Sequence, residues 1–159
     1  MAHTLITLQR KQNNVKNMPK QLLIFSDGGA RGNPGPAATG FLILSETGQV
    51  LMANSRYLGS RTNNQAEYEA LIAALESALK LQADEVTCHL DSQLVTKQVT
   101  GEYRVKNPEL KQLWLKVQEL RRNFKKTTFI SVPRTNIQIQ KADALVNETL
   151  DKQYGHSSR

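Results

Sequence analysis

The chain has 159 residues, with 21 lysine and arginine residues against 14 aspartate and glutamate residues and a formal net charge of +7. Its length suits one domain with a layered core, and no run approaches the roughly 20 apolar residues of a membrane span. The single cysteine, Cys88, excludes an internal disulfide framework and favours a reducing cytoplasm. The excess of positive charge favours an acidic partner such as nucleic acid.

The two ends of the chain differ in composition from the middle. The first twenty residues carry four cations and no acid, and they lack the apolar segment of a signal peptide. We therefore expect a disordered basic arm over residues 1–20, one folded domain over 21–153 and a flexible tail over 154–159.

The first part of the folded domain is predicted to form three strands. Residues 22–26 are apolar without alternation, which is typical of a central strand that is buried on both faces. Residues 39–44 and 49–58 follow, and the short turn around Gly48 predicts an antiparallel hairpin. These segments indicate a three-strand meander.

The second part alternates helices and strands. The predicted elements are a helix over 64–81, a strand over 85–90, a helix from about Asp91 to Gly101, a helix over 107–123, a strand over 127–132 and a helix over 140–153. A meander followed by this alternation predicts an α/β protein, with a mixed five-stranded sheet and helices on both of its faces.

Four acids stand where a charged ligand is expected. Asp27 ends the first strand and Asp91 follows the fourth, and strands of such sheets deliver ligands at their carboxyl ends. Glu67 lies four residues before Leu71 on the core-facing stripe of its helix, where a carboxylate is unfavourable unless it is paired or bound to a metal. Asp143 is expected in the first turn of the last helix, beside the apolar stripe of that helix.

Each of these acids also has an ordinary structural interpretation. Asp91 and Asp143 suit caps at helix starts, and Asp27 suits a turn before two glycines. Glu67 suits the favourable interaction of an acid with the first turn of a helix. The four acids together are harder to explain in this way, so the set favours a metal site.

Four segments resemble the type 1 ribonuclease H family in order and spacing. They are DGGARGNPGPAATGF (27–41), TNNQAEYEALIAAL (62–75), LDSQLVTKQVTGEYRVKNP (90–108) and VPR…KADALVNETLD (132–151). Together they span nearly all of residues 20–152. The absence of a long Trp- and Lys-rich loop after Gly101 resembles the compact archaeal and related bacterial branch, which lacks the basic protrusion.

The resemblance implies an RNase H-like fold and an endoribonuclease that hydrolyses the RNA strand of RNA/DNA hybrids. Two Mg²⁺ or Mn²⁺ ions would serve as cofactors, and the products would carry 5′-phosphate and 3′-hydroxyl ends. The family's catalytic and metal-binding acids fall on Asp27, Glu67, Asp91 and Asp143. Four carboxylates suffice for this task, because two ions clamp a scissile phosphate and Mg²⁺ keeps several of its waters.

The resemblance also implies contacts with the substrate. Asn33, Asn63 and Asn64 would reach the minor groove of the hybrid, where amides can engage the 2′-hydroxyls that only RNA carries, and Gly28 would also lie against the substrate. The glycines of residues 28–35 would let the loop approach the sugar–phosphate backbone. A loop conformation for Asn33 and helix caps for Asn63 and Asn64 are the structural alternatives.

The segment before Asp143 departs from the family pattern. The spacer TNIQIQKA (135–142) is about two residues longer and has Ile139 where the family has an asparagine. Longer bacterial members place a histidine in this loop to aid product release, and Arg134 is the candidate substitute here. A salt bridge at the rim of the core is the alternative for Arg134.

Two other functions compete with the nuclease. One is a non-catalytic nucleic-acid-binding module of the same fold, which would have no reason to keep mutually repelling carboxylates. The other is a different nuclease or strand-transfer enzyme of the superfamily, whose cores usually carry three acids and lack the GNPGP and TNNQAE segments. We expect a cytoplasmic monomer that acts on RNA/DNA hybrids, with double-stranded RNA as a further candidate substrate and no membrane association.

Overall fold

The computed structural model describes Met18 and residues 20–154, so nearly all of the expected arm and tail lie outside the described residues. The described elements are β1 (Gln21–Ala30), β2 (Gly35–Ser45), β3 (Val50–Arg61), α2 (Asn63–Lys80), β4 (Glu85–Leu90), α3 (Gln93–Val99), α4 (Pro108–Arg121), β5 (Lys126–Ser131) and α5 (Ile137–Tyr154). Each predicted strand and helix is present, with ends that shift by several residues. None of the described helices combines the length and the apolar character needed to cross a bilayer.

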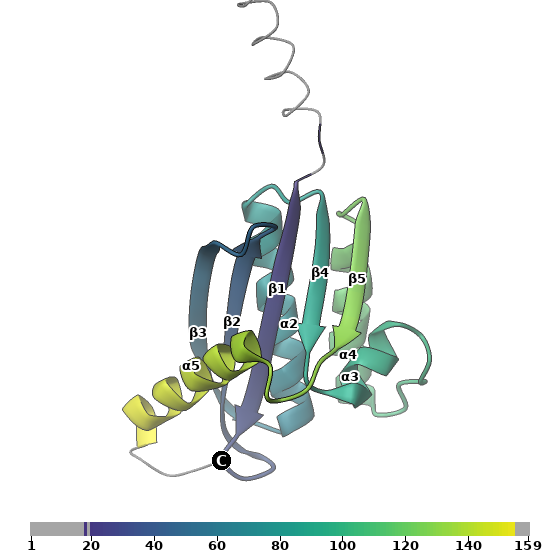
Figure 1. Cartoon of the computed structure of the whole chain (residues 1–159). Helices are drawn as coiled ribbons and strands as arrows, with labels where there is room; N and C mark the ends of the chain where they lie inside the picture. Colours follow the sequence, from purple (N-terminus) through teal and green to yellow (C-terminus); the bar gives the residue numbers. More distant parts are fainter. Residues whose placement is uncertain (1–17, 19, 155–159) are drawn as a thin grey trace, which may run out of the picture.

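The strands form one mixed sheet in the order β3-β2-β1-β4-β5 (Figure 1). Strands β1, β2 and β3 pair antiparallel, as the meander predicted, whereas β4 pairs in parallel with both β1 and β5. The turn between β2 and β3 contains Gly48 in a left-handed conformation (φ 88°) and lies at the end of the sheet opposite to α5 (Figure 1). The predicted α/β class and sheet type are confirmed.

Helices cover both faces of the sheet. Helices α2 and α4 lie behind the sheet in Figure 1, and α5 crosses the front over β1, β2 and β3. The main core fills the space behind the sheet and includes Ile24, Ile43, Leu71 and Leu75, all fully buried. A smaller core of Phe25, Leu42, Leu44 and Ile139 lies in front, where α5 begins.

Helix α2 begins with a capping box. The Thr62 hydroxyl accepts a hydrogen bond from Gln65 N, and the Gln65 side chain accepts one from Thr62 N. Because the helix starts at Asn63, Glu67 is its fifth residue and lies beyond the first turn. The interpretation of Glu67 as a first-turn acid is therefore wrong, whereas its place on the buried stripe with Leu71 is confirmed.

The capping interpretations of two further acids are also wrong. Ser92 is the N-cap of α3, so Asp91 stands one residue outside the helix. Helix α5 starts at Ile137, where the side-chain oxygen of Asn136 accepts hydrogen bonds from two backbone amides, so Asp143 is the seventh helical residue. Helix α5 thus begins about one turn earlier than predicted, and Ile139 of this first turn is buried in the smaller core.

Two glycines let helices approach the sheet closely on its two faces. A Cβ at Gly28 would lie 2.1 Å from the backbone oxygen of Ala66 in α2, and a Cβ at Gly40 would lie 2.4 Å from that of Ala142 in α5. The missing side chain of Gly28 thus makes room for the protein's own helix, and the expected approach of the glycine-containing loop to a nucleic acid stays a prediction. Both contacts involve the residue just before a predicted metal ligand, Glu67 or Asp143.

Strand β1 continues well beyond its pairing with β4. The last pair between them is Phe25 with His89, whereas β1 runs on to Ala30 with only β2 beside it. Asp27 lies in this one-sided extension, opposite Gly40 of β2. The end of β4 therefore leaves an opening next to Asp27, into which side chains from both faces of the sheet can reach.

Candidate active site

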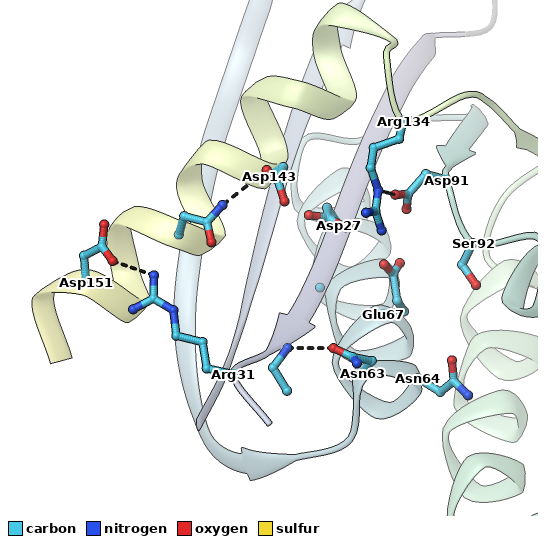
Figure 2. Close-up of a pocket in the computed structure, with 13 residues that line it drawn as sticks. Asp27, Arg31, Asn63, Asn64, Glu67, Asp91, Ser92, Arg134, Asp143 and Asp151 are labelled. Atoms are coloured by element: carbon cyan, nitrogen blue, oxygen red, sulfur yellow. Dashed lines mark hydrogen bonds and ion pairs between the residues drawn. The ribbon is translucent and has the colours of Figure 1, made fainter. Parts of the chain in front are cut away.

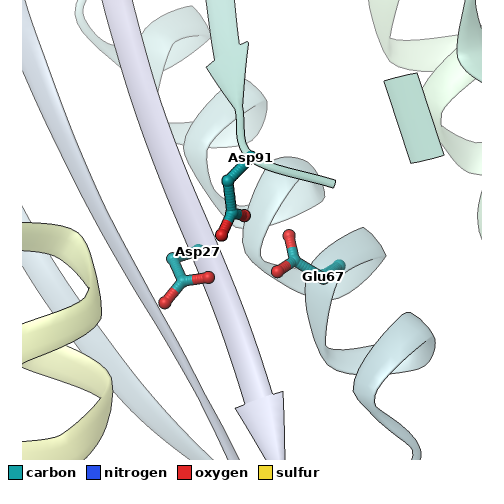
Figure 3. Close-up of side chains that lie close together, drawn as sticks. All are labelled: Asp27, Glu67 and Asp91. Atoms are coloured by element: carbon teal, nitrogen blue, oxygen red, sulfur yellow. The ribbon is translucent and has the colours of Figure 1, made fainter. Parts of the chain in front are cut away.

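Three of the four predicted acids meet at this opening (Figure 3). Asp27, Glu67 and Asp91 each contribute a carboxylate oxygen, and these oxygens lie within 4.8 Å of one another. They come from a strand, a helix and the segment after a parallel strand, far apart in sequence. The predicted grouping of these three acids is therefore present in the fold.

Burial makes this cluster electrostatically costly. Asp27, Glu67 and Asp91 are all largely shielded from water, and like charges so close together disfavour full ionisation. Burial, followed by the charges of Asp27 and Asp91 and a hydrogen bond to Asp27, raises the pKa of the Glu67 carboxyl well above its usual value. The Gly28 N–H group donates to Glu67 and opposes this shift only in part.

The donor atoms of the cluster fit a divalent cation. Glu67 Oε2 and Asp91 Oδ1 are buried, and neither has a hydrogen-bond partner within the described part of the chain. Buried polar atoms without partners are rare in folded proteins and call for a specific explanation. Carboxylate oxygens are the ligands that Mg²⁺ and Mn²⁺ prefer, so a hard divalent ion would satisfy both the charge and the unpartnered oxygens.

Asp143 lines the same pocket but stands apart from the three-acid group. The pocket has a volume of about 890 Å³, and Asp143, Asn147 and Asp151 of α5 form one of its walls (Figure 2). The amide Nδ2 of Asn147 donates a hydrogen bond to Asp143 Oδ2 over 3.2 Å. Asp143 is not among the acids whose oxygens all lie within 4.8 Å of one another, and it extends into the pocket from the α5 wall (Figure 2).

Arg134 reaches the cluster from the spacer before α5. Its Nε donates to Asp91 Oδ2 over 3.2 Å, and its side chain is 88% exposed, against 9% for Asp91 (Figure 2). The structural alternative of a salt bridge at the rim is therefore present. The same geometry leaves the guanidinium at the mouth of the pocket, where an anionic ligand would enter.

Two of the predicted substrate-contacting amides form hydrogen bonds that hold the loop after β1. Asn63 Oδ1 accepts a hydrogen bond from Ala30 N over 2.9 Å, and Asn33 Oδ1 accepts one from Asn63 N over 3.0 Å. Neither Asn63 nor Asn64 is the cap of α2, because Thr62 has that role. Asn63 and Asn64 line the pocket together with Gly28, whereas Asn33 is not one of its lining residues.

Sequence reasoning missed several residues of the site. Gly40 admits α5 to the sheet, and Arg31 of the loop pairs with Asp151 of α5 in the pocket wall. The spacing of Asp143 and Asp151 on one helix, together with a cation in the glycine-rich loop, was the available signal. No local pattern indicates the role of Gly40, because it depends on a helix about 100 residues later in the chain.

The mixed sheet and its acidic pocket define a protein of the reverse transcriptase-like class, whose family model matches residues 25–149. A ribonuclease HI of Halobacterium salinarum is 44% identical over 80% of this chain. A bifunctional protein of Mycobacterium tuberculosis is 39% identical over 82% of this chain. The chain spans 63% of the length of the first relative and 36% of the second.

Solved structures narrow the class further. The crystal structure of RNase H1 from Halobacterium salinarum superposes with a TM-score of 0.80 at 42% identity, covering 83% of this chain and 98% of that one. LC11-RNase H1 in complex with an RNA/DNA hybrid gives a TM-score of 0.77 at 43% identity, with coverage of 83% and 98%. The chain therefore belongs to the type 1 ribonuclease H family.

Proposed function

We propose that this chain is a ribonuclease H that hydrolyses the RNA strand of RNA/DNA hybrids and depends on divalent metal ions. The observation that carries the proposal is the meeting of Asp27, Glu67 and Asp91 within 4.8 Å in a buried opening at the edge of β1. Such a cluster is unfavourable as a purely structural feature. The hybrid-bound relative LC11-RNase H1 supports the choice of substrate.

Each acid has a defined part in this proposal. Asp27, Glu67, Asp91 and Asp143 would hold two Mg²⁺ or Mn²⁺ ions, which would activate the attacking water and stabilise the leaving 3′ oxygen. The products would carry 5′-phosphate and 3′-hydroxyl ends. The rigid placement of Asp27 and Asp91 by β1 and β4 orients their carboxylates before any ligand arrives, which limits the reorganisation needed during reaction.

Recognition of the hybrid would use the amides beside the pocket. The oxygens of Asn33 and Asn63 accept hydrogen bonds within the protein, so the nitrogen of each amide is the group it would offer to a 2′-hydroxyl. Asn64 and Gly28 line the same wall. Arg134, already at the mouth of the pocket, would engage a phosphate of the cleaved strand.

The proposal extends to the setting of the reaction. The enzyme would act as a monomer in a reducing cytoplasm, and its thiol, Cys88, is buried in the core with a raised pKa because burial disfavours the thiolate. Double-stranded RNA is a second substrate to be examined. The net charge of +7 would draw either polyanion to the surface.

A cleavage assay tests the proposal directly. Labelled RNA/DNA hybrid, double-stranded RNA and double-stranded DNA would each be incubated with the protein in Mg²⁺, in Mn²⁺ and in EDTA. We expect cleavage of the RNA strand of the hybrid with either metal and none in EDTA. Binding of the hybrid without cleavage in either metal would instead identify a non-catalytic module.

A further inference from the structure

Helix α5 carries Asp143 and is held on the sheet by the buried apolar side chains of one face. It is the one described helix on the front of the sheet, and it follows the spacer over 132–136 (Figure 1). Its start is fixed by Ile139 in the smaller core, its middle by the close approach of Ala142 to Gly40, and its later turns by Val146 and Leu150, which are fully buried beside Ala38 of β2. The polar contacts of α5 beside the pocket add to this apolar anchoring.

The second half of α5 is tied to the loop after β1 by an ion pair. The guanidinium of Arg31 donates to Asp151 Oδ1 in the pocket wall (Figure 2). Arg31 lies four residues after Asp27, and Asp151 lies eight residues after Asp143. The ion pair thus joins the loop that follows the strand of Asp27 to the helix of Asp143.

Helix geometry makes this tie effective. Eight residues span about 12 Å along the helix axis and are offset by about 80° around it. An anchor at Asp151 therefore resists both sliding of α5 along the sheet and rotation of α5 about its own axis. Either movement would turn the Asp143 carboxylate away from the three-acid cluster.

The burial of Arg31 separates it from the substrate-facing cations. Its side chain is only 8% exposed, whereas that of Arg134, the other cation lining the pocket, is 88% exposed. A guanidinium presents its donors in a rigid planar fork, which suits a fixed carboxylate partner. Arg31 is therefore placed to hold the protein's own helix, and it is poorly placed to bind a phosphate from solution.

We infer that Arg31 and Asp151 are positioning residues, which set the affinity of the site for divalent cations by holding Asp143 toward Asp27, Glu67 and Asp91. This inference rests on the proposed function of the four acids as metal ligands. Residues that orient metal ligands typically change metal affinity or activity by about 10- to 100-fold when they are replaced.

The direction in which Arg31→Gln changes the affinity for Mn²⁺ distinguishes a positioning role of Arg31 from a purely electrostatic one. Arg31→Gln removes a positive charge beside a cation site, so charge alone predicts tighter binding of Mn²⁺. Loss of the positioning of Asp143 predicts weaker binding of Mn²⁺. Calorimetric titration of the full chain with Mn²⁺, without any nucleic acid, should give binding about 10-fold weaker or more in Arg31→Gln.

A matched control removes one positive charge from α5, the helix to which Arg31 is paired. Lys152 of α5 forms an exposed ion pair with Glu148 over 3.3 Å. Lys152→Gln should therefore leave Mn²⁺ affinity within about twofold of the original chain, since exposed pairs of this kind contribute little. Circular dichroism on each variant checks that the fold is retained, and Arg31→Lys provides a milder replacement that keeps the charge but loses the fork.

A double variant tests whether Arg31 affects Mn²⁺ affinity by way of Asp143. In Asp143→Asn, where the positioned carboxylate is already lost, Arg31→Gln should weaken Mn²⁺ binding no further. Unchanged or tighter binding in Arg31→Gln, or an equal loss in both backgrounds, would overturn the inference. If Arg31→Gln does not fold, Arg31→Lys decides by the same comparison, with a smaller loss expected.

The outcome is separable from that of the hybrid assay. A chain that shows the coupled Mn²⁺ losses but cleaves no hybrid keeps the positioning inference and overturns the proposed reaction. A chain that cleaves hybrid but shows no loss of Mn²⁺ affinity in Arg31→Gln supports the proposed reaction and overturns the positioning inference.

Discussion

The two sides of the acidic pocket are built in different ways. On one side, Asp27, Glu67 and Asp91 sit on β1, on α2 and directly after β4, all packed around the main core. On the other side, Asp143 sits on α5, which rests on the sheet through two small apolar clusters, one glycine contact and hydrogen-bonded side chains. The first side is drawn from three elements around the main core, whereas the second is carried by one helix on the other face of the sheet.

This difference shows how the fold can hold mutually repelling carboxylates close together before any ligand binds. The sheet and α2 offset the repulsion among three acids through the burial of a large apolar core. The fourth acid faces the others from a separately anchored helix, farther from their oxygens. Substitutions on the first side should therefore abolish function, whereas those on the second should reduce it by degrees.

The largest effect is expected from Asp91→Asn. The shape is retained and the charge that faces the metal is lost, so the cleavage rate should fall at least about 100-fold, since metal stabilisation of the transition state is worth several kcal/mol. The thermal midpoint without metal should stay the same or rise, because repulsion with Asp27 and Glu67 is relieved. Single-turnover rates in Mg²⁺ measure this, and a variant that retains a tenth of the original rate would contradict the metal-ligand role of Asp91.

Asp143→Ala should have a smaller but still severe effect. We expect a loss of about 10-fold or more in Mg²⁺ and a partial recovery in Mn²⁺, which tolerates imperfect coordination more readily. The thermal midpoint should not show the loss of a cap, since Asp143 is the seventh residue of α5. Full activity of the variant in Mg²⁺ would leave a three-acid site.

Arg134→Ala should have a milder effect of a different kind. Its exposed guanidinium contributes at most about 1 kcal/mol through the pair with Asp91, so we expect a several-fold change in turnover or in hybrid affinity. Mn²⁺ should not restore the loss, because no metal ligand is missing. Steady-state kinetics in both metals separate this variant from Asp143→Ala, and a strong recovery in Mn²⁺ would assign Arg134 to the orientation of Asp91.

The smallest expected effect is on stability and comes from Glu67→Gln in EDTA. An acid whose pKa is raised by folding binds its proton more tightly in the folded chain, so stability falls as pH rises from the unfolded value, about 4.3, through the folded one. Glu67→Gln should remove this fall and raise the thermal midpoint at neutral pH, by about 2–4 °C for each kcal/mol relieved. The two proteins should converge near pH 4, and a midpoint that is lower in the variant at neutral pH would contradict the raised pKa of Glu67.

Much of the side of the pocket that carries Asp27, Glu67 and Asp91 could be predicted from the sequence. Unbroken apolar runs located β1, and the stripe before Leu71 gave the burial of Glu67, because both signals are local. The end of β1 could not be predicted, since its extension from Asp27 to Ala30 pairs with β2 although it contains Gly28 and Gly29, and glycine and aspartate are depleted in strands. The resemblance to a known family, and not periodicity, assigned the four acids to one site.

The side of the pocket that α5 forms was harder to predict for physical reasons. The start of α5 at Ile137 depends on the burial of Ile139 against Phe25 and Leu42, which no local pattern shows. The capping interpretation of Asp143 was wrong because this extra turn moved the helix start. The pair of Arg31 and Asp151 joins residues 120 positions apart, so only the folded chain reveals it.

The turn between β2 and β3 offers a practical attachment point for the molecule. It lies at the end of the sheet opposite to α5 (Figure 1), and a Cβ at Gly48 would meet no atom within 4 Å. Loop tips of this kind tolerate insertions, so a peptide tag or a fluorophore placed after Gly48 would leave the pocket facing outward. A chain immobilised through this turn could be tested for cleavage of single nucleic-acid molecules while its acidic pocket stays accessible.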